Sequence, residues 1–193
     1  MLLQDYNKYK WFLTNSGILV VAGKSAVQND ELLKRIKSMN REFIVMHTNS
    51  PGSPFSIILE DPGKVTKEDM QECAIFTASF SRAWRLKKKG AIIDLFKVSQ
   101  LSKPIKLKVG TWIVKGKVER KEFPLGLVLT VQEKKLRAVP EKTVKLKRNV
   151  LLNVFPGEKD KTKMTEEISK KLNNKFSREE ILAALPAGGV SFK

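Results

Sequence analysis

The sequence predicts an α+β protein with a mainly antiparallel sheet, two principal helices and a small C-terminal β-α-α appendage. Three observations support this fold class. Short apolar runs separated by turn residues dominate as far as residue 140, which is typical of strands joined by tight connections. Two capping boxes each precede an apolar pattern of helical period. After Pro140 an extended run is followed by two short helical patterns, so we expect one domain at 1–140 and a small subdomain at 141–193.

The first ninety residues are expected to alternate strands and helices. The predicted elements are strands at 10–14 and 18–22, a helix opened by the capping box at 25–28, strands at 43–47 and 55–59, and a long helix from 66 to about 89. In the first helix Asn29, Leu32, Leu33 and Ile36 share one face. The second helix begins at the capping box of residues 66–69, and its basic end suits a helix C-terminus.

Strands are expected to dominate the next fifty residues, and a mixed unit to close the chain. The predicted elements are strands at 92–98, 105–109, 111–118, 125–131 and 135–139, an extended run at 144–155, a polar loop at 156–161, and helices at 164–172 and 177–185. Strict alternation of Leu125, Leu127, Leu129 and Val131 is the clearest strand signal.

Composition excludes several functional classes and favours a polyanion partner. With 41% hydrophobic residues the chain can bury a core, and its single cysteine and single histidine exclude disulfide frameworks and multi-ligand zinc sites. No apolar stretch is long enough to cross a bilayer and no secretion signal is visible, so we expect a cytoplasmic protein with no membrane partner, cofactor or metal. The net charge of +17 is typical of a nucleic-acid-binding protein.

The positive charge is concentrated between residues 82 and 121, where bases far outnumber acids. We predict that the side chains of this stretch contact phosphates: Arg82, Arg85, Lys87, Lys88, Lys89, Lys97, Lys103, Lys106, Lys108, Lys115 and Lys117. Trp112 lies among them and is our candidate for stacking on a base, although tryptophan more often belongs to a core.

A second candidate site combines Lys24, His47 and Ser53. Gly23-Lys24-Ser25 has the strand–turn–helix context of a phosphate loop but lacks its glycine spacing, so nucleotide hydrolysis is disfavoured and a single phosphate contact by Lys24 is expected. His47 precedes a Pro-Gly loop that contains Ser53. We interpret these residues as a polar contact site, and the alternative is an RNA-processing or RNA-modification enzyme or accessory subunit that uses His47 as a general acid or base.

Several of these residues resemble, in order, the motifs of the NFACT-R domain, the RNA-binding domain of the NFACT proteins of ribosome-associated quality control. The matching segments are Tyr9-Lys-Trp-Phe12, Ser16-Gly17, Val20-Val21, Gly23-Lys24, Gln28-Asn29, His47-Thr48, Pro51-Gly52-Ser53, Ala83-Trp84, Val98, Ser102-Lys103-Pro104 and Lys115-Gly116-Lys117. The terminal hairpin at 127–140 is also similar. The tail resembles the extension of archaeal members, so the chain looks like a stand-alone, archaeal-type member.

The resemblance implies an RNA-binding module with tRNA or ribosomal RNA as partner, linked to ribosome-associated quality control or translation. It also implies the ribosome, or a separate NFACT-type or RNA-modifying protein, as a further partner. We expect a form of the domain without the family's N-terminal module and coiled-coil arms, so the pathway stays open between quality control and RNA modification. DNA binding and protein docking are the remaining alternatives.

Overall fold

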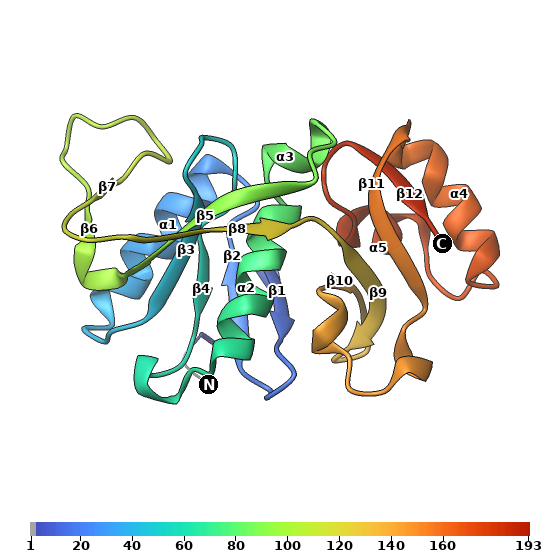
Figure 1. The fold of residues 1–193 in the computed structure, drawn as a ribbon, viewed down its shortest axis with the longest axis horizontal. Coiled ribbons are helices and arrows are strands. Elements are labelled where there is room, and N and C mark those ends of the chain that lie inside the picture. Colours follow the sequence, from blue (N-terminus) through green and yellow to red (C-terminus); the bar gives the residue numbers. More distant parts are fainter. Residues whose placement is uncertain (1–2) are drawn as a thin grey trace.

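Two sheets side by side organise the chain in a computed structural model that describes residues 3–193 (Figure 1). A six-stranded antiparallel sheet of order β1-β2-β4-β3-β5-β8 forms the first half, residues 3–125. A four-stranded antiparallel sheet of order β10-β9-β11-β12 forms the second half, residues 126–193. The predicted α+β class with a mainly antiparallel sheet is therefore confirmed.

The first sheet is built from short strands: β1 (Lys10–Leu13), β2 (Leu19–Ala22), β3 (Ile44–Thr48), β4 (Ser56–Ile58), β5 (Gly90–Lys97) and β8 (Glu119–Pro124). The two principal helices are α1 (Ala26–Ser38) and α2 (Lys67–Ser79), and they cover opposite faces of this sheet. The alternation of side chains along the strands produces both cores. Val45 and Ile57 are paired across β3 and β4 on the α1 face, whereas Ile44 and Ile58 are paired on the α2 face.

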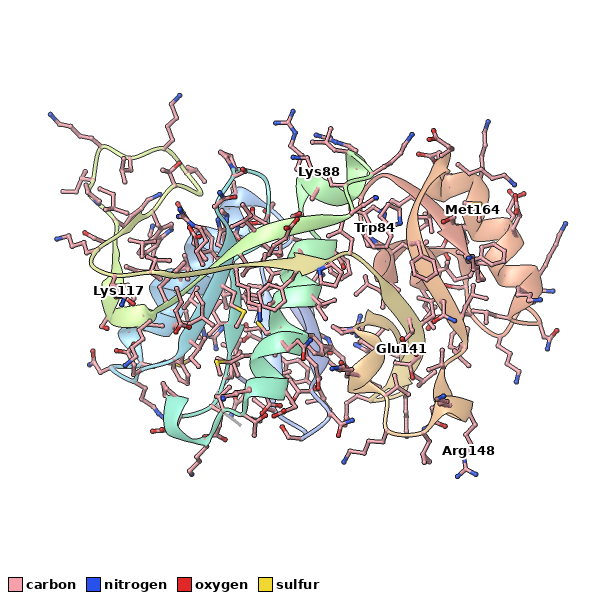
Figure 2. The ribbon with its side chains drawn as sticks, viewed as in Figure 1. Trp84, Lys88, Lys117, Glu141, Arg148 and Met164 are labelled. Atoms are coloured by element: carbon pink, nitrogen blue, oxygen red, sulfur yellow. The ribbon has the colours of Figure 1, made fainter. Side chains whose placement is uncertain are left out.

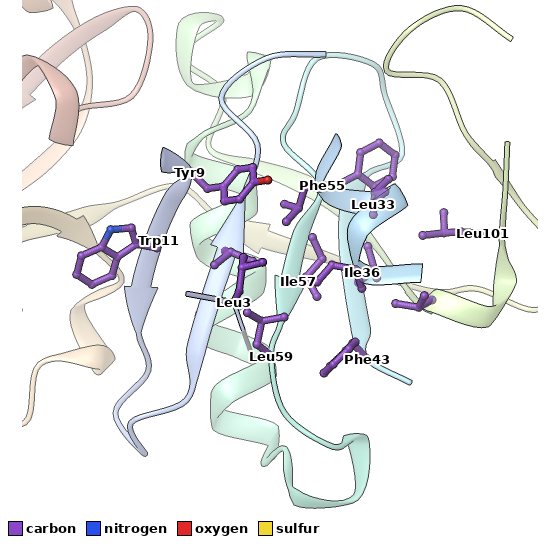
Figure 3. Packing of buried hydrophobic residues seen from close by; sticks show 14 of the residues in the cluster. Leu3, Tyr9, Trp11, Leu33, Ile36, Phe43, Phe55, Ile57, Leu59 and Leu101 are labelled. Carbon is purple, nitrogen blue, oxygen red and sulfur yellow. The ribbon is translucent and has the colours of Figure 1, made fainter. Parts of the chain in front are cut away.

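The core under α1 joins the helix to the inner strands. Figure 3 shows Leu33 and Ile36 of α1 beside Ile57 and Phe55, with Phe43 at the lower end of the cluster. Leu33, Ile36, Phe43 and Ile57 are fully buried. The helical face expected from the sequence therefore packs as predicted.

The two helix starts follow the capping signals in different ways. Thr66 and Asp69 form the full reciprocal capping box that begins α2. The Oγ atom of Ser25 accepts a hydrogen bond from the Gln28 amide at 3.2 Å, but the Gln28 side chain accepts from the Lys24 amide instead of the Ser25 amide. Ser25 is therefore the N-cap, and Gln28 closes the turn before it.

The prediction of one long helix from 66 to 89 is wrong, because α2 ends at Ser79 and a short helix α3 (Arg82–Arg85) follows. The Oγ atom of Ser81 donates to the Ala78 carbonyl at 2.6 Å and accepts from the Ala83 amide at 3.1 Å. The Arg82 amide donates to the Gly52 carbonyl at 2.7 Å instead of continuing the helix. A serine that competes for backbone hydrogen bonds thus ends one helix and caps the next.

The strand predicted at 105–109 is also wrong, because residues 103–112 form a loop that projects from the first half (Figure 1). Ile105 and Val109 point into solvent and have no core to join. The strand predicted at 111–118 shrinks to β7 (Ile113–Val114), which pairs with β6 (Leu101–Ser102). The edge strand β8 was not predicted, since its residues are mostly charged and exposed.

The second half contains the strands β9 (Leu127–Gln132), β10 (Lys135–Val139), β11 (Leu152–Asp160) and β12 (Gly189–Phe192), with the helices α4 (Lys161–Lys171) and α5 (Arg178–Ala184). The predicted β9–β10 turn is confirmed, with positive φ at Glu133 and Lys134. The polar loop predicted at 156–161 is instead the end of β11, which carries a bulge there. Strand β12 was not predicted.

The hairpin β9–β10 hydrogen-bonds to β11 and so belongs to the second sheet. The change from one sheet to the other lies between β8 and β9, near Gly126, whose amide donates to Ser79 Oγ at 3.2 Å. The division of the chain into domains at residue 140 stays a prediction.

The two halves meet along a contact that we call the seam. The side chain of Gln132 accepts from the Leu13 amide at 2.9 Å and donates to the Leu13 carbonyl at 2.8 Å, as a strand partner would. Trp84 of α3 is fully buried in the core of the second half, and its Nε1 donates to the Gly189 carbonyl at 2.9 Å. Figure 2 shows Trp84 where the two halves meet.

Across residues 3–193, the helices are too short or too polar to traverse a lipid bilayer. Over the same range, no three His, Cys, Asp or Glu side chains gather as a group that could hold a metal ion.

Candidate functional site

Four of the sequence-predicted residues line one groove of about 570 Å³ at the end of the first sheet. Lys24 follows β2 and His47 is the second-last residue of β3. Ser53 lies in the loop after β3, and Trp112 lies at the end of the 103–112 loop. The second half contributes Ala187 to the same wall. Tertiary structure therefore brings together side chains that are spread over ninety residues.

The turn that carries Lys24 is fixed by close contacts. A Cβ atom on Gly23 would come within 2.2 Å of Asn29 Oδ1, so only glycine fits there. The same oxygen accepts from the Phe55 amide at 3.2 Å, which ties the start of α1 to β4. The turn is held on both sides, and it leaves the Lys24 side chain exposed.

His47 is held as a neutral imidazole with one nitrogen free to act as an acceptor. Its ring stacks on Phe55 with centroids 4.2 Å apart, and its Nδ1 lies 2.6 Å from the Thr48 carbonyl oxygen. Burial lowers the pKa of His47 below its ordinary value, although the Thr48 carbonyl and Asp94 act in the opposite direction. With the proton on Nδ1, Nε2 is the acceptor.

His47 and Asp94 do not form a catalytic pair. The two residues face each other across β3 and β5. However, the Asp94 carboxylate is held by Arg120 in a two-point contact, with nitrogen–oxygen distances of 2.6 and 3.0 Å. Arg120 therefore balances the negative charge of the Asp94 carboxylate, and no hydrogen bond joins that carboxylate to the imidazole.

Ser53 shapes the loop after β3. Its Oγ accepts from the Thr48 amide at 3.0 Å, and Thr48 Oγ1 donates to the Ser50 carbonyl at 2.6 Å. Ser53 is 9% exposed. The hydroxyl predicted as a contact group therefore also fixes the path of the loop.

Asp30 organises the 103–112 loop, and sequence reasoning missed it. Its Oδ1 accepts from Trp112 Nε1 at 2.8 Å, from the Gly110 amide at 3.0 Å and from Lys103 Nζ at 3.2 Å. Burial alone would raise the pKa of Asp30, but these hydrogen bonds lower it below its ordinary value. The available signal was an acid next to Asn29 on the buried side of a predicted helix.

Lys103, predicted as a phosphate contact, makes hydrogen bonds within the protein instead. Besides Asp30, its ammonium donates to the carbonyls of Lys108 at 2.7 Å and Thr111 at 2.9 Å. These contacts occupy its three protons. Trp112 packs partly against the core, and its indole N–H is taken by Asp30.

The other predicted basic residues are scattered. Arg82 and Lys88 line a second hollow on the far side of the 48–51 loop, and Lys87 pairs with Glu158 of the second half. Figure 2 shows Lys88 and Lys117 at widely separated places. The remaining members of the predicted set are exposed along α3, β5 and the segments that follow: Arg85, Lys89, Lys97, Lys106, Lys108 and Lys115.

Lys10 was also missed, although it lines the groove at the seam. Burial first, and then the nearby charges of Lys161, Lys24 and Arg137, lower the pKa of Lys10 to about 7. No local pattern marks this residue, because its neighbours come from the other half of the chain.

Comparison with known proteins places the chain in a family. Residues 8–116, more than half of the chain, match the family described as the NFACT protein RNA binding domain. The chain is 32% identical over 95% of its length to the archaeal Rqc2 homolog aRqcH of Methanocaldococcus jannaschii. It is 29% identical over 42% of its length to a Drosophila melanogaster ribosome quality control complex subunit NEMF homolog. It spans 28% and 8% of these two relatives.

A solved structure shares the fold. It is the C-terminal part of the fibronectin/fibrinogen-binding protein from Streptococcus suis, with a TM-score of 0.53 and 20% identity over 65% of this chain and 47% of the other. At this identity the likeness concerns the fold alone. Together with the match over residues 8–116, the order of motifs from Trp11 to Lys117 shows that the chain belongs to the family of NFACT protein RNA-binding domains.

Proposed function

We propose that the chain binds structured RNA, either tRNA or ribosomal RNA, as an RNA-binding module of ribosome-associated quality control. Membership of the NFACT RNA-binding family supports RNA as the ligand. The names of the archaeal and fly relatives support the pathway. The net charge of +17 supports a polyanion as partner.

The observation that carries the proposal is the convergence of Lys24, His47 and Trp112 on one groove. An exposed ammonium can neutralise a backbone phosphate. A neutral imidazole acceptor can take a hydrogen bond from a ribose 2′-hydroxyl, which DNA lacks. The indole of Trp112 offers a face for stacking, and Arg120 cancels the charge of the acid Asp94 in the wall.

The proposal is tested by binding purified protein to a tRNA and to duplex DNA of similar size, from about 50 to 200 mM salt. We expect tighter binding to tRNA and a log-log salt slope that reflects on the order of five phosphate contacts. Equal, weak binding to both polymers that disappears at the higher salt would contradict the proposal.

Three variants separate the contributions of the groove. Lys24→Met should weaken tRNA and DNA binding alike and reduce the salt slope by about one. His47→Ala should weaken tRNA binding more than DNA binding, because only RNA carries the 2′-hydroxyl. The matched control is Lys64→Met, which removes an exposed lysine at the opposite end of β4.

The same His47→Ala variant tests the enzymatic alternative. A general acid or base at His47 predicts that wild-type protein changes the tRNA chemically and that the variant does not. We expect tRNA recovered after incubation with either protein to be intact and unmodified by mass spectrometry. Chemical change of the tRNA by the wild type that is lost in the variant would mean that the protein is an enzyme and not only a binding module.

A further inference from the structure

Four cations from both halves lie near one another where the groove reaches the seam, and we call them the seam cluster: Lys10, Lys24, Arg137 and Lys161. Lys10 and Lys24 line the groove itself. Lys10 begins β1, the strand that faces the second half in Figure 1, while Arg137 lies on β10 and Lys161 begins α4. Lys10 and Lys161 reach the carbonyls of the adjacent residues Ala183 and Leu182, and Arg137 lies over the ring of Trp11, the residue after Lys10. The charges of Lys161, Lys24 and Arg137 all act on Lys10, and those of Arg137 and Lys135 act on Lys24.

Within residues 3–193 the seam cluster has no carboxylate partner at ion-pair distance. The ammonium of Lys10 lies 4.2 Å from the centre of the Phe80 ring and reaches only the Ala183 carbonyl, at a long 3.4 Å. Lys161 likewise reaches only the Leu182 carbonyl, at 3.4 Å. The donors of these two ammonium groups are therefore largely unused.

Arg137 is similarly unpartnered. Its guanidinium carbon lies 4.0 Å above the centre of the Trp11 ring, and its Nε is buried without a hydrogen-bond partner. The buried Nε1 of Trp11 also lacks a partner. Figure 3 shows the Trp11 indole on the outer side of β1, turned away from the rest of its cluster.

This arrangement is unfavourable for the protein alone. Like charges repel one another, and a partly buried cation without a partner loses hydration that nothing replaces. The lowered pKa of Lys10, caused first by burial and then by Lys161, Lys24 and Arg137, is a direct expression of that cost. Lys161 adds to it, because the first position of a helix is where the dipole disfavours a cation.

An anion between the two halves would reverse each of these effects. It would supply acceptors for the unused donors and would cancel the mutual repulsion. Lys10 and Lys24 both line the groove, so a chain of phosphates lying in the groove would reach the seam. The walls at this end include Phe80 and Ala187, which limit hydration of the bound group.

We propose that Lys10, Lys24, Arg137 and Lys161 form a phosphate-binding site at the seam, and that it takes one backbone phosphate of the RNA that the groove binds. The choice of RNA as the source of the phosphate rests on the function proposed above. Because the site uses residues of both halves, a bound phosphate also stabilises the contact between them.

The test uses Lys10→Met and Lys161→Met, one variant from each half, in the tRNA salt series. Methionine keeps the apolar stem of lysine and removes the charge. We expect each variant to reduce the salt slope by about one relative to wild type and to the Lys64→Met control. The double variant should lose less than the sum of the single losses in log affinity, because both ammonium groups act on one phosphate.

Circular dichroism and the thermal unfolding midpoint of each variant establish that it is folded before it is compared. If one of the pair does not fold, Arg137→Met takes its place with the same expected loss. Slopes and affinities equal to those of Lys64→Met would overturn the proposal.

A second arm separates the site from the proposed function. Tripolyphosphate binding, measured by calorimetry without RNA, should also be weakened by Lys10→Met and Lys161→Met and not by Lys64→Met. If wild-type protein binds tripolyphosphate in this way but does not bind tRNA, the proposed function fails and the seam takes a free polyphosphate. If tRNA binds but no seam variant affects it, the function stands and the seam proposal fails.

Discussion

The basic stretch at 82–121 and the seam cluster show two ways in which a protein can carry positive charge. The first is conspicuous in the sequence, yet its side chains are dispersed over several elements or held by internal partners such as Asp30 and Glu158. The second is invisible in the sequence, because its four members lie on β1, after β2, on β10 and on α4. Density of charge along the chain is therefore a poor guide to density of charge in space.

The difference has an electrostatic consequence. Exposed lysines on the 103–112 loop are surrounded by water and salt, which weaken their action on any one phosphate. Three of the seam cations, Lys10, Arg137 and Lys161, are partly buried and lack counter-charges, so each of them acts more strongly on an anion placed between them. The following predictions break or sharpen this comparison, from the largest expected effect to the smallest.

Removing Trp84 should have the largest effect, because its indole fills the core of the second half although it belongs to the first. We expect Trp84→Ala to lower the free energy of unfolding by about 3–5 kcal/mol, as is usual for a buried tryptophan. Urea denaturation measures it, with the neighbouring Leu86→Ala, a 52% exposed side chain, as control. Equal stability of the two variants would show that the halves do not depend on this contact.

The next largest effect is expected at Asp30, which holds the 103–112 loop. Asp30→Asn leaves the ammonium of Lys103 without its carboxylate in a site where the two side chains are only 11% and 16% exposed. We expect a loss of about 2–3 kcal/mol in the free energy of unfolding, somewhat below the full cost of an unpaired buried charge. Adding Lys103→Met to the variant should restore part of that loss, and strictly additive losses would contradict the pairing.

Neutralising an exposed lysine of the loop should affect RNA binding less than neutralising a seam lysine. We expect Lys106→Met to reduce the tRNA salt slope by less than Lys10→Met, because Lys106 is exposed and Lys10 is partly buried among other cations. The same titrations at several salt concentrations measure both slopes. A larger loss from Lys106→Met would assign the main phosphate contacts to the loop.

The smallest expected effect concerns pH. Burial lowers the pKa of His47 in the folded protein, so the unfolded chain takes up a proton at higher pH than the folded chain does. The contribution of His47 is therefore constant above about pH 6.5, and stability falls as the pH drops below that value. Urea midpoints at about pH 7.5 and 5.5 should differ less in His47→Gln than in wild type. If the two midpoints differ by the same amount in His47→Gln as in wild type, a group other than His47 causes the pH dependence.

Much of the fold follows from local signals. The capping box at Thr66, the apolar face of α1 and the β9–β10 turn are each set by neighbouring residues, and each was predicted. The errors lie where distant groups decide. The start of α3 depends on a hydrogen bond from Arg82 to Gly52, and the shape of the 103–112 loop depends on Asp30.

The sequence by itself determined the α+β class, the family and the polyanion character, because composition, periodicity and motif order are properties of the chain. It also indicated Lys24, His47, Ser53 and Trp112 as candidates, although it did not show that they line one groove. Tertiary structure alone decided that Lys103 is held by Asp30 and that Lys10 and Lys161, from different halves, reach adjacent carbonyls of α5. Contacts of this kind depend on how the two sheets meet, and no local pattern in the sequence encodes that arrangement.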